Sequence, residues 1–230
     1  MTETSRLPPR RDAVRLKNAR KLSTSSQRWL QRQLNDPYVA AAKARGWRSR
    51  AAFKLIELDE KYKLISKEAR VVDLGAAPGG WSQVALAQGA EIVVGIDLLA
   101  IEPVAGAAFI QGDFLDEGME ARLVEMLGGK ADLVLSDMAP NTSGHVATDH
   151  LRIMALAETA LAFACGVLAP GGAFVAKLFQ GGAEKDMLNM LKARFKTVRH
   201  AKPPASRKDS KEMYVVAMGF RPDPEQPEGR

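Results

Sequence analysis

A glycine-rich turn at residues 73–81, DLGAAPGGW, lies between a short apolar run and a segment typical of a helix. Glycines in such a turn let the backbone approach a ligand closely and bend sharply into the helix. The spacing is not the G-x-G-x-x-G of dinucleotide-binding proteins, because Gly75, Ala77 and Gly80 occupy those three positions. The turn therefore predicts a ligand site of a different kind.

Two aspartates follow the next two apolar runs, Asp97 after residues 92–96 and Asp113 after residues 108–110. A carboxylate in the first place can accept the hydroxyl hydrogens of a ribose, and one in the second can accept from the amine of a base. Each aspartate taken alone is explained more simply as a helix cap or turn residue. Beside the glycine turn, the pair favours a nucleoside. No Gly-Lys-Ser/Thr phosphate motif follows the turn, so the expected cofactor is S-adenosylmethionine.

Lys177 lies within the apolar run VAKL at residues 175–178. A lysine in a buried strand is unusual and needs a partner. Asp137 follows another apolar run and could form a structural ion pair with it. The sequence also allows both residues to take part in chemistry.

The middle of the chain alternates short apolar runs with helix-forming segments, which predicts a mostly parallel α/β sheet with helices on both faces. Strands are expected at 71–74, 92–96, 108–110, 132–135, 173–178, 196–200 and 213–218, and helices at 81–88, 119–127, 147–168 and 184–195. The last two strands should pair as an antiparallel edge, since only a loop separates them. We expect the break after helix 147–168 at residues 170–172. Three shorter helices should precede the sheet, the first capped by Ser25-Ser26, the second started by Asp36-Pro37 and the third capped by Ser49.

The composition, 46% hydrophobic and 26% charged, is that of an ordinary soluble globular protein. No apolar run reaches the roughly 18 residues of a membrane span, and the basic N-terminus lacks the apolar core of a secretory signal. The single cysteine excludes an internal disulfide and a cysteine-based zinc site, and the three histidines show no metal-ligand spacing. We expect a cytoplasmic protein without metal, membrane or obligate protein partner, and a monomer by default.

The net charge of +6 is unevenly distributed along the chain. Residues 1–70 carry +11, residues 71–191 carry −10 and residues 192–214 carry +6. A single basic segment can be a solvated face, but two that flank an acidic middle favour a polyanionic partner such as RNA. We expect the two basic segments to converge on one face.

The domain organisation predicted from these patterns is one folded unit with two extensions. Residues 1–22 hold seven basic residues and two prolines, which predicts a flexible arm. Residues 23–220 should form the domain, with N-terminal helices at 23–69 and the α/β core at 70–220. The Pro- and Glu-rich residues 221–230 predict a disordered tail.

Several motifs together resemble the FtsJ/RlmE family of S-adenosylmethionine-dependent ribosomal RNA 2′-O-ribose methyltransferases. They are SRAAFKL (49–55), DLGAAPGGWSQ (73–83), QGDF (111–114), SDMAPN (136–141), LAPGG (168–172) leading into Lys177, and SR (206–207) with Glu212 and Tyr214. The resemblance covers about residues 25–220, or roughly 85% of the chain. It is specific because the motifs occur in order and at consistent spacing.

The resemblance implies a Rossmann-like methyltransferase fold and a Lys-Asp-Lys-Glu catalytic tetrad at Lys54, Asp137, Lys177 and Glu212. The cofactor residues that it implies are Gly79, Trp81, Asp97, Asp113 and Asp137. It also implies 23S rRNA of the large ribosomal subunit as partner, with a uridine of the A-loop as target. Without the motifs, Lys54 and Glu212 would look like surface charges, and Trp81 could equally be a core residue.

In the implied reaction, a ribose 2′-hydroxyl attacks a sulfonium methyl group in an in-line displacement. A base within hydrogen-bond reach helps by removing the hydroxyl proton, and a lysine can do so only when it is neutral. We assign Lys177 as the base and Lys54 to the developing alkoxide. Asp137 would hold Lys177, and Glu212 would position Lys54 or the substrate.

Two other functions remain open on the sequence. One is a non-catalytic RNA-binding or ribosome-assembly factor, which would have no use for a lysine inside a strand. The other is a nicotinamide-dependent oxidoreductase, which the spacing of the glycines disfavours.

Overall fold

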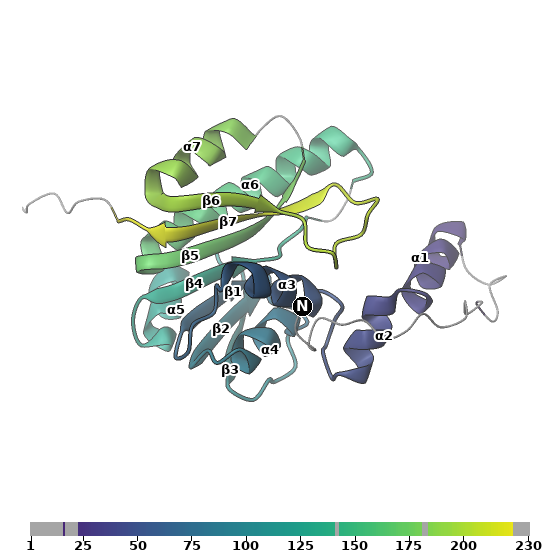
Figure 1. The fold of residues 1–230 in the computed structure, drawn as a ribbon, viewed down its shortest axis with the longest axis horizontal. Helices are drawn as coiled ribbons and strands as arrows, with labels where there is room; N and C mark the ends of the chain where they lie inside the picture. Colours follow the sequence, from purple (N-terminus) through teal and green to yellow (C-terminus); the bar gives the residue numbers. More distant parts are fainter. Residues whose placement is uncertain (1–15, 17–22, 141–142, 181–183, 223–230) are drawn as a thin grey trace, which may run out of the picture.

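One seven-stranded sheet forms the centre of the protein (Figure 1). The computed structural model describes residue 16 and residues 23–140, 143–180 and 184–222; most of the predicted arm and most of the predicted tail lie outside these ranges. The strands are β1 Arg70–Leu74, β2 Ile92–Asp97, β3 Ala107–Gln111, β4 Ala131–Ser136, β5 Leu168–Phe179, β6 Phe195–Ala201 and β7 Glu212–Phe220. Their order across the sheet is β3-β2-β1-β4-β5-β7-β6.

The first five strands run parallel, and β7 lies antiparallel between β5 and β6. This confirms the predicted α/β class, the mostly parallel sheet and the antiparallel pairing of the last two strands. From β1 the chain continues to β2 and β3 on one side of the sheet, and from β4 it continues to β5 on the other side, so the order reverses between β1 and β4. In open α/β sheets, ligands bind beyond the carboxyl ends of the strands at such a switch point.

Helices cover both faces of the sheet (Figure 1). They are α1 Thr24–Leu34, α2 Pro37–Ala44, α3 Ala52–Tyr62, α4 Gly80–Ala87, α5 Met119–Leu127, α6 Val146–Val167 and α7 Glu184–Arg194. Helices α2, α3 and α4 pack on one face, and α5, α6 and α7 on the other.

The strands are apolar on both faces because each face has its own buried core. Successive side chains of a strand point to opposite faces, so Val72 and Leu74 join the core beneath α5 and α6 while Val71 joins the core beneath α3 and α4. Helix α3 contributes Phe53 and Leu55 to the second core, both fully buried. The sheet and α3 therefore form one rigid support.

Helix α6 is, among the helices of the described residues, long and apolar enough by length and composition to cross a membrane. Its buried residues, among them Met154, Ala157 and Ala164, pack in the core over the sheet. A core helix passes the same test, and this packing accounts for the composition of α6.

Two predicted helix caps are wrong by a few residues. Helix α1 is capped by Ser23, whose Oγ accepts a hydrogen bond from the Ser26 amide at 3.2 Å. The N-cap of α3 is Ala51, which makes no side-chain cap. Ser49 instead uses its backbone carbonyl, which accepts from the Ala52 amide at 3.2 Å. A tight turn before α3 thus takes the place of a serine cap. The start of α2, with Asp36 as cap and Pro37 first, is as predicted.

The predicted break at residues 170–172 is a bulge inside β5. The strand begins at Leu168, directly after α6, and Leu168 pairs with Ala131. The next pair joins Ala173 to Leu133, so the extra residues of β5 bulge out between two paired positions. Gly171, with φ of +85°, adopts the left-handed backbone that this irregularity requires.

The centre of the sheet leaves no space for a side chain at Gly95 in β2. A Cβ at this position would lie 2.7 Å from the Phe109 ring and 2.8 Å from Ala76 Cβ. We expect Gly95→Ala to lower the free energy of unfolding by about 1–3 kcal/mol because of overpacking. Urea denaturation measures this change. Gly112→Ala is the control, since its nearest atom would be 3.6 Å away; equal stability of the two variants would contradict the expectation.

Candidate active site

The glycine turn links the end of β1 to α4 and lies close to the end of β4. Gly75 has φ of +72°, and a Cβ there would lie 2.4 Å from Met138 Cγ, just beyond β4. Gly79 has φ of +100° and forms the N-cap of α4. Both positions need glycine for conformation, and Gly75 also needs it for space. The turn leaves the N-terminus of α4 facing the edge where the parallel strands end.

Asp97 and Asp113 lie at the ends of the neighbouring strands β2 and β3. Asp97 accepts the amides of Ala77 and Leu99 at 2.9 Å each, one on each carboxylate oxygen. Asp113 Oδ1 accepts the Leu115 amide at 3.0 Å. Both aspartates therefore do serve as turn residues. A carboxylate oxygen accepts two hydrogen bonds, so these turns leave capacity for a ligand.

Three leucines at the same strand ends are exposed: Leu98, Leu99 and Leu115, at 68%, 67% and 58%. They are not among the predicted site residues, although they directly follow Asp97 or lie two residues after Asp113. A flat apolar ligand such as a base could cover them. Two hydrogen-bond-accepting carboxylates, a glycine turn and exposed leucines together fit the expected nucleoside cofactor.

The side chain of Trp81 points away from these groups and into the core. Its indole is buried at 3% exposure, packs against Tyr214 with ring centroids 5.7 Å apart, and donates from Nε1 to the Ala51 carbonyl at 2.8 Å. The indole therefore joins α4 to the start of α3. Only the backbone of Trp81, in the first turn of α4, remains for a cofactor.

The four residues of the predicted tetrad meet in one cluster at the strand ends. Lys54 projects from α3, Lys177 from β5 and Glu212 from the start of β7, and Asp137 follows β4. Lys54 Nζ donates to Glu212 Oε2 at 2.9 Å and lies 3.7 Å from Asp137 Oδ2. Lys177 Nζ lies 2.9 Å from Asp137 Oδ1 and donates to the Asp137 carbonyl at 2.5 Å. Asp137 thus stands between the two lysines.

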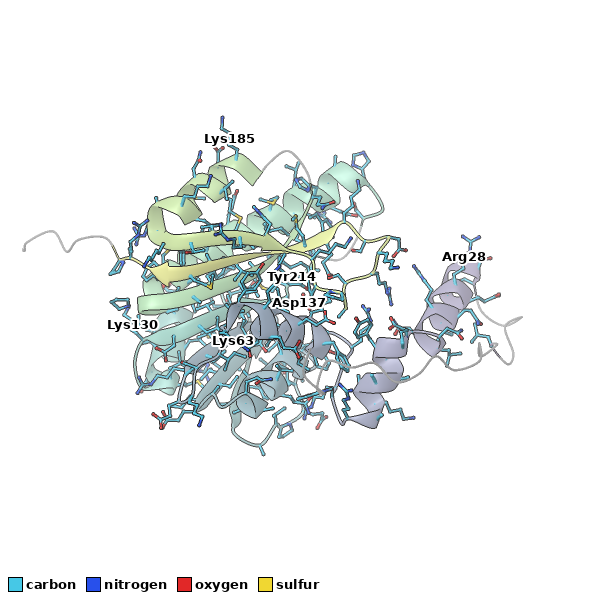
Figure 2. The ribbon with its side chains drawn as sticks, in the orientation of Figure 1. Arg28, Lys63, Lys130, Asp137, Lys185 and Tyr214 are labelled. Carbon is cyan, nitrogen blue, oxygen red and sulfur yellow. The ribbon has the colours of Figure 1, made fainter. Side chains whose placement is uncertain are left out.

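Tyr214 is a fifth member of the cluster, and it lies in one of the matching motifs but is not among the predicted site residues. Its hydroxyl donates to Asp137 Oδ1 at 2.5 Å and accepts from Lys54 Nζ at 3.0 Å. Tyr214 pairs with Lys177 across β5 and β7 and is fully buried. Figure 2 shows Asp137 and Tyr214 close together beside α3. The signal in the sequence is the spacing of Glu212 and Tyr214, which places both on one face of a strand.

The charges in the cluster compensate one another. Burial alone would raise the pKa of Asp137, but Lys177 and Lys54, with the hydrogen bonds from Tyr214 and Lys177, hold this pKa below its usual value. Burial raises the pKa of Tyr214 well above 10, and the charges of Asp137 and Glu212 raise it further. Tyr214 therefore stays protonated and Asp137 stays ionised at neutral pH.

The segment before β7 is fastened to α3, which sets Glu212 beside Lys54. Glu57 accepts the Ala205 amide at 2.7 Å, and Arg50 donates to the Ala205 carbonyl at 2.6 Å. Ser206 Oγ then donates to Glu212 Oε1 at 2.7 Å. Helix α3 therefore orients both Lys54 and its carboxylate partner.

A cavity of about 300 Å³, which we call the basic groove, opens beside Glu212. It is lined by Arg32, Arg50, Arg207, Asp209, Ser210 and Glu212. Arg32 and Arg50 belong to the first basic segment and Arg207 to the second. The two segments thus meet next to the tetrad, as the charge pattern predicts.

Arg48 is basic but points into the fold around the glycine turn. Its guanidinium donates to the carbonyls of Pro78, Glu102 and Pro103 at 3.0, 2.5 and 2.6 Å. Its backbone amide donates to Gln83 Oε1 at 2.9 Å. Arg48 therefore ties the turn and α4 to the loop that follows Asp97.

Asp73, at the end of β1, is a buried carboxyl group beneath the same turn. It is 1% exposed and accepts from Ser82 Oγ at 2.7 Å, while its Oδ1 has no hydrogen-bond partner among the described residues. Burial, followed by the charges of Asp137 and Asp97, raises its pKa to about 7, against the hydrogen bonds from Ser82. Near neutral pH, Asp73 is therefore partly protonated.

The Tyr214 hydroxyl should contribute to stability through its two charged partners. Tyr214→Phe leaves Asp137 and Lys54 each without one hydrogen bond in a buried place, so we expect the free energy of unfolding to fall by about 1–3 kcal/mol. Chemical denaturation measures it. Tyr62→Phe is the control, because its hydroxyl bonds no described residue; a similar small effect in both variants would refute the role of the Tyr214 hydroxyl.

The raised pKa of Asp73 makes a pH-dependent contribution to stability. Between about pH 4 and 7 the unfolded chain ionises this group while the folded chain keeps it protonated, so the wild type should lose stability as pH rises. Relative to Asp73→Asn, its unfolding equilibrium should shift by up to about tenfold per pH unit in this window and level off above pH 7. Urea denaturation of both proteins from pH 4 to 8.5 tests this. A difference that does not change with pH would overturn it.

The chain is similar over nearly its whole length to curated bacterial proteins. One from Acidiphilium cryptum, named ribosomal RNA large subunit methyltransferase E, is 73% identical over 223 residues, which cover 97% of this chain and 99% of the relative. One from Granulibacter bethesdensis with the same name is 70% identical over 94% of each chain.

The fold is also similar to that of a solved structure. A crystal structure from Plasmodium falciparum, described as a ribosomal RNA methyltransferase, is 32% identical, with a TM-score of 0.68 over 76% of this chain and 98% of that one. The family model for FtsJ-like methyltransferases matches residues 47–220, which include the glycine turn and all four residues of the tetrad. The chain therefore belongs to the FtsJ-like methyltransferase family.

Proposed function

We propose that this protein transfers a methyl group from S-adenosylmethionine to the 2′-hydroxyl of an RNA ribose. The observation that carries the proposal is the buried network in which Asp137 and Tyr214 join Lys54 to Lys177 at the ends of the strands. A structural ion pair would need one lysine, whereas this network holds two on one carboxylate. Such an arrangement suits a reaction in which one amine is a base and the other stabilises an oxyanion.

The proposed substrate is 23S rRNA of the large ribosomal subunit, and the proposed target is a uridine of its A-loop. The names of the relatives at 73% and 70% identity support large-subunit ribosomal RNA. The basic groove beside Glu212 supports a polyanionic substrate at this place. The enzyme would act as a monomer in the cytoplasm.

The residues proposed to hold the cofactor are Gly79, Trp81, Asp97, Asp113 and Asp137. Asp97 would accept the ribose hydroxyls and Asp113 the amine of the base. Trp81 would contribute through its backbone, because its indole is bonded to Ala51. When bound, S-adenosylmethionine would supply an electrophilic methyl group on a sulfonium, and loss of this methyl group would leave a neutral thioether.

Lys177 is the proposed base because its hydrogen bonds leave one position open. Its Nζ bonds two oxygens, both of Asp137, and a neutral amine could direct its lone pair to the 2′-hydroxyl. Lys54 Nζ is surrounded by three acceptors, on Glu212, Tyr214 and Asp137. It would stabilise the alkoxide as the proton moves to Lys177. Alignment of the hydroxyl with the methyl group would supply much of the remaining acceleration.

Labelled S-adenosylmethionine tests the proposal directly. The wild-type protein, incubated with large-subunit rRNA or ribosomal particles, should yield labelled 2′-O-methylated nucleoside in digests of the RNA. Lys177→Ala and Asp137→Ala should lower the rate by at least about 10²-fold, since general bases contribute about 10²–10⁴-fold. Circular dichroism shows whether each variant is folded. Lys185→Ala, at an exposed position of α7 (Figure 2), is the matched control and should leave the rate unchanged.

The possible results separate the candidate functions. Full activity of Lys177→Ala would rule out Lys177 as the base while leaving methyl transfer intact. No transfer by the wild type to any RNA or particle, with RNA binding retained, would favour a non-catalytic binding factor on the same fold.

A further inference from the structure

A second cavity, of about 630 Å³, lies at the N-terminal end of α6, where β5 ends. We call it the histidine cavity. It is lined by Gly144, His145, Ala147, His150, Phe179, Gln180 and Lys211. None of these residues belongs to the tetrad or to the proposed cofactor site, so the proposed reaction does not account for this cavity.

The histidine cavity is lined by residues that are neighbours of the proposed catalytic cluster in β5 and at the start of β7. Phe179 lies two residues after Lys177 in β5 and pairs with Glu212 in β7. The Gln180 amide donates to the Lys211 carbonyl at 3.0 Å. Lys211 lines this cavity and its neighbour Glu212 lines the basic groove. The two cavities therefore lie on either side of the segment that brings Glu212 to Lys54.

The lining combines the groups that recognise a nucleobase. Phe179 offers an aromatic ring, Gln180 an amide that can both donate and accept, and Lys211 a positive charge. The charge suits an RNA strand, and the apolar part of the lining suits a base rather than a phosphate. The cavity volume exceeds that of a single base and leaves space for its ribose.

His150 gives an independent indication of a ligand. Its Nε2 is buried and has no hydrogen-bond partner among the described residues. A buried polar atom without a partner costs free energy, and such atoms are uncommon in folded proteins. His145 differs, because its Nδ1 is within 2.9 Å of Thr148 Oγ1. His150 therefore lines the histidine cavity and has an unused hydrogen-bonding position on its buried Nε2.

We infer that the histidine cavity binds an unpaired base of the RNA strand, from a nucleotide next to the one that is methylated. The inference rests on the proposed function. Sequence-specific RNA recognition commonly uses bases that are splayed out of the stack and held by an aromatic ring and polar side chains. The strand would cross the cluster with its backbone along the basic groove and one neighbouring base in the cavity. His150 and Gln180 would bond the edge of that base.

A cycle that combines protein and RNA changes tests the inference. The probe is a short single-stranded RNA with the target nucleotide, in which each neighbouring nucleotide in turn is made abasic. One abasic position should weaken binding to the wild type about tenfold, in keeping with the contribution of one stacked base. His150→Ala should weaken binding of the intact RNA to a similar extent, and the same abasic position should then have little further effect. Fluorescence anisotropy measures these affinities.

Two further variants keep the test interpretable. Gln180→Ala changes an exposed residue of the cavity and should show the same coupling to the abasic position. His200→Ala, an exposed histidine of β6, is the matched control and should bind every RNA as the wild type does. S-adenosylmethionine affinity should be the same in all of these variants.

Several results would overturn the inference. The first is that the abasic change and His150→Ala weaken RNA binding independently, so that their effects on the free energy of binding add. Another is weaker binding of His150→Ala to ribosomal particles but not to the RNA, which would indicate a protein partner instead. Because binding is measured without turnover, the cycle can succeed even where no methyl transfer is found, so failure of the cavity and failure of the proposed function are distinguishable.

Discussion

The buried carboxylate of Asp137 is the group on which the cluster at the strand ends depends. A charge in such a place is costly unless it is paired and hydrogen-bonded. Asp137 Oδ1 receives Lys177 and the Tyr214 hydroxyl, and Oδ2 faces Lys54. Each lysine has a second anchor, on the Asp137 carbonyl or on Glu212. The geometry is therefore fixed from several sides, and the loss of a charged partner would leave part of a buried charge uncompensated.

The direction of β7 is what makes this arrangement possible. The carboxyl ends of β4 and β5 bring Asp137 and Lys177 to one edge of the sheet. Because β7 is antiparallel to β5, its first residues lie at that same edge, and Glu212 and Tyr214 reach the cluster from near the end of the chain. A parallel β7 would start at the opposite edge. The reversed strand thus contributes directly to the candidate active site.

Apolar periodicity is a local signal, and it predicted the helices and strands well. The tetrad came from the motifs of the resemblance, and the structure brings its four residues into one cluster. The sequence missed Tyr214, whose role depends on its register opposite Lys177 and on the approach of α3. It placed the cap of α3 on Ser49, because the tight turn before α3 has no local signal. His150 could not be singled out either, since its cavity forms only where α6 meets the end of β5. A feature that forms only where distant segments of the chain meet cannot be predicted from a local sequence pattern.

The charge pattern also changes meaning once the fold is known. Composition counts every arginine of the first basic segment equally toward RNA, but the guanidinium of Arg48 is bonded to three carbonyls around the glycine turn. Arg50 is paired with Asp36 at 2.8 Å and bonded to Ala205. Part of the +11 segment therefore holds the turn and the segment before β7 in place. Attraction of a polyanion then rests on fewer side chains than the net charge suggests, because Arg50 and Arg207 of the basic groove lie 2.8 and 3.8 Å from Asp36.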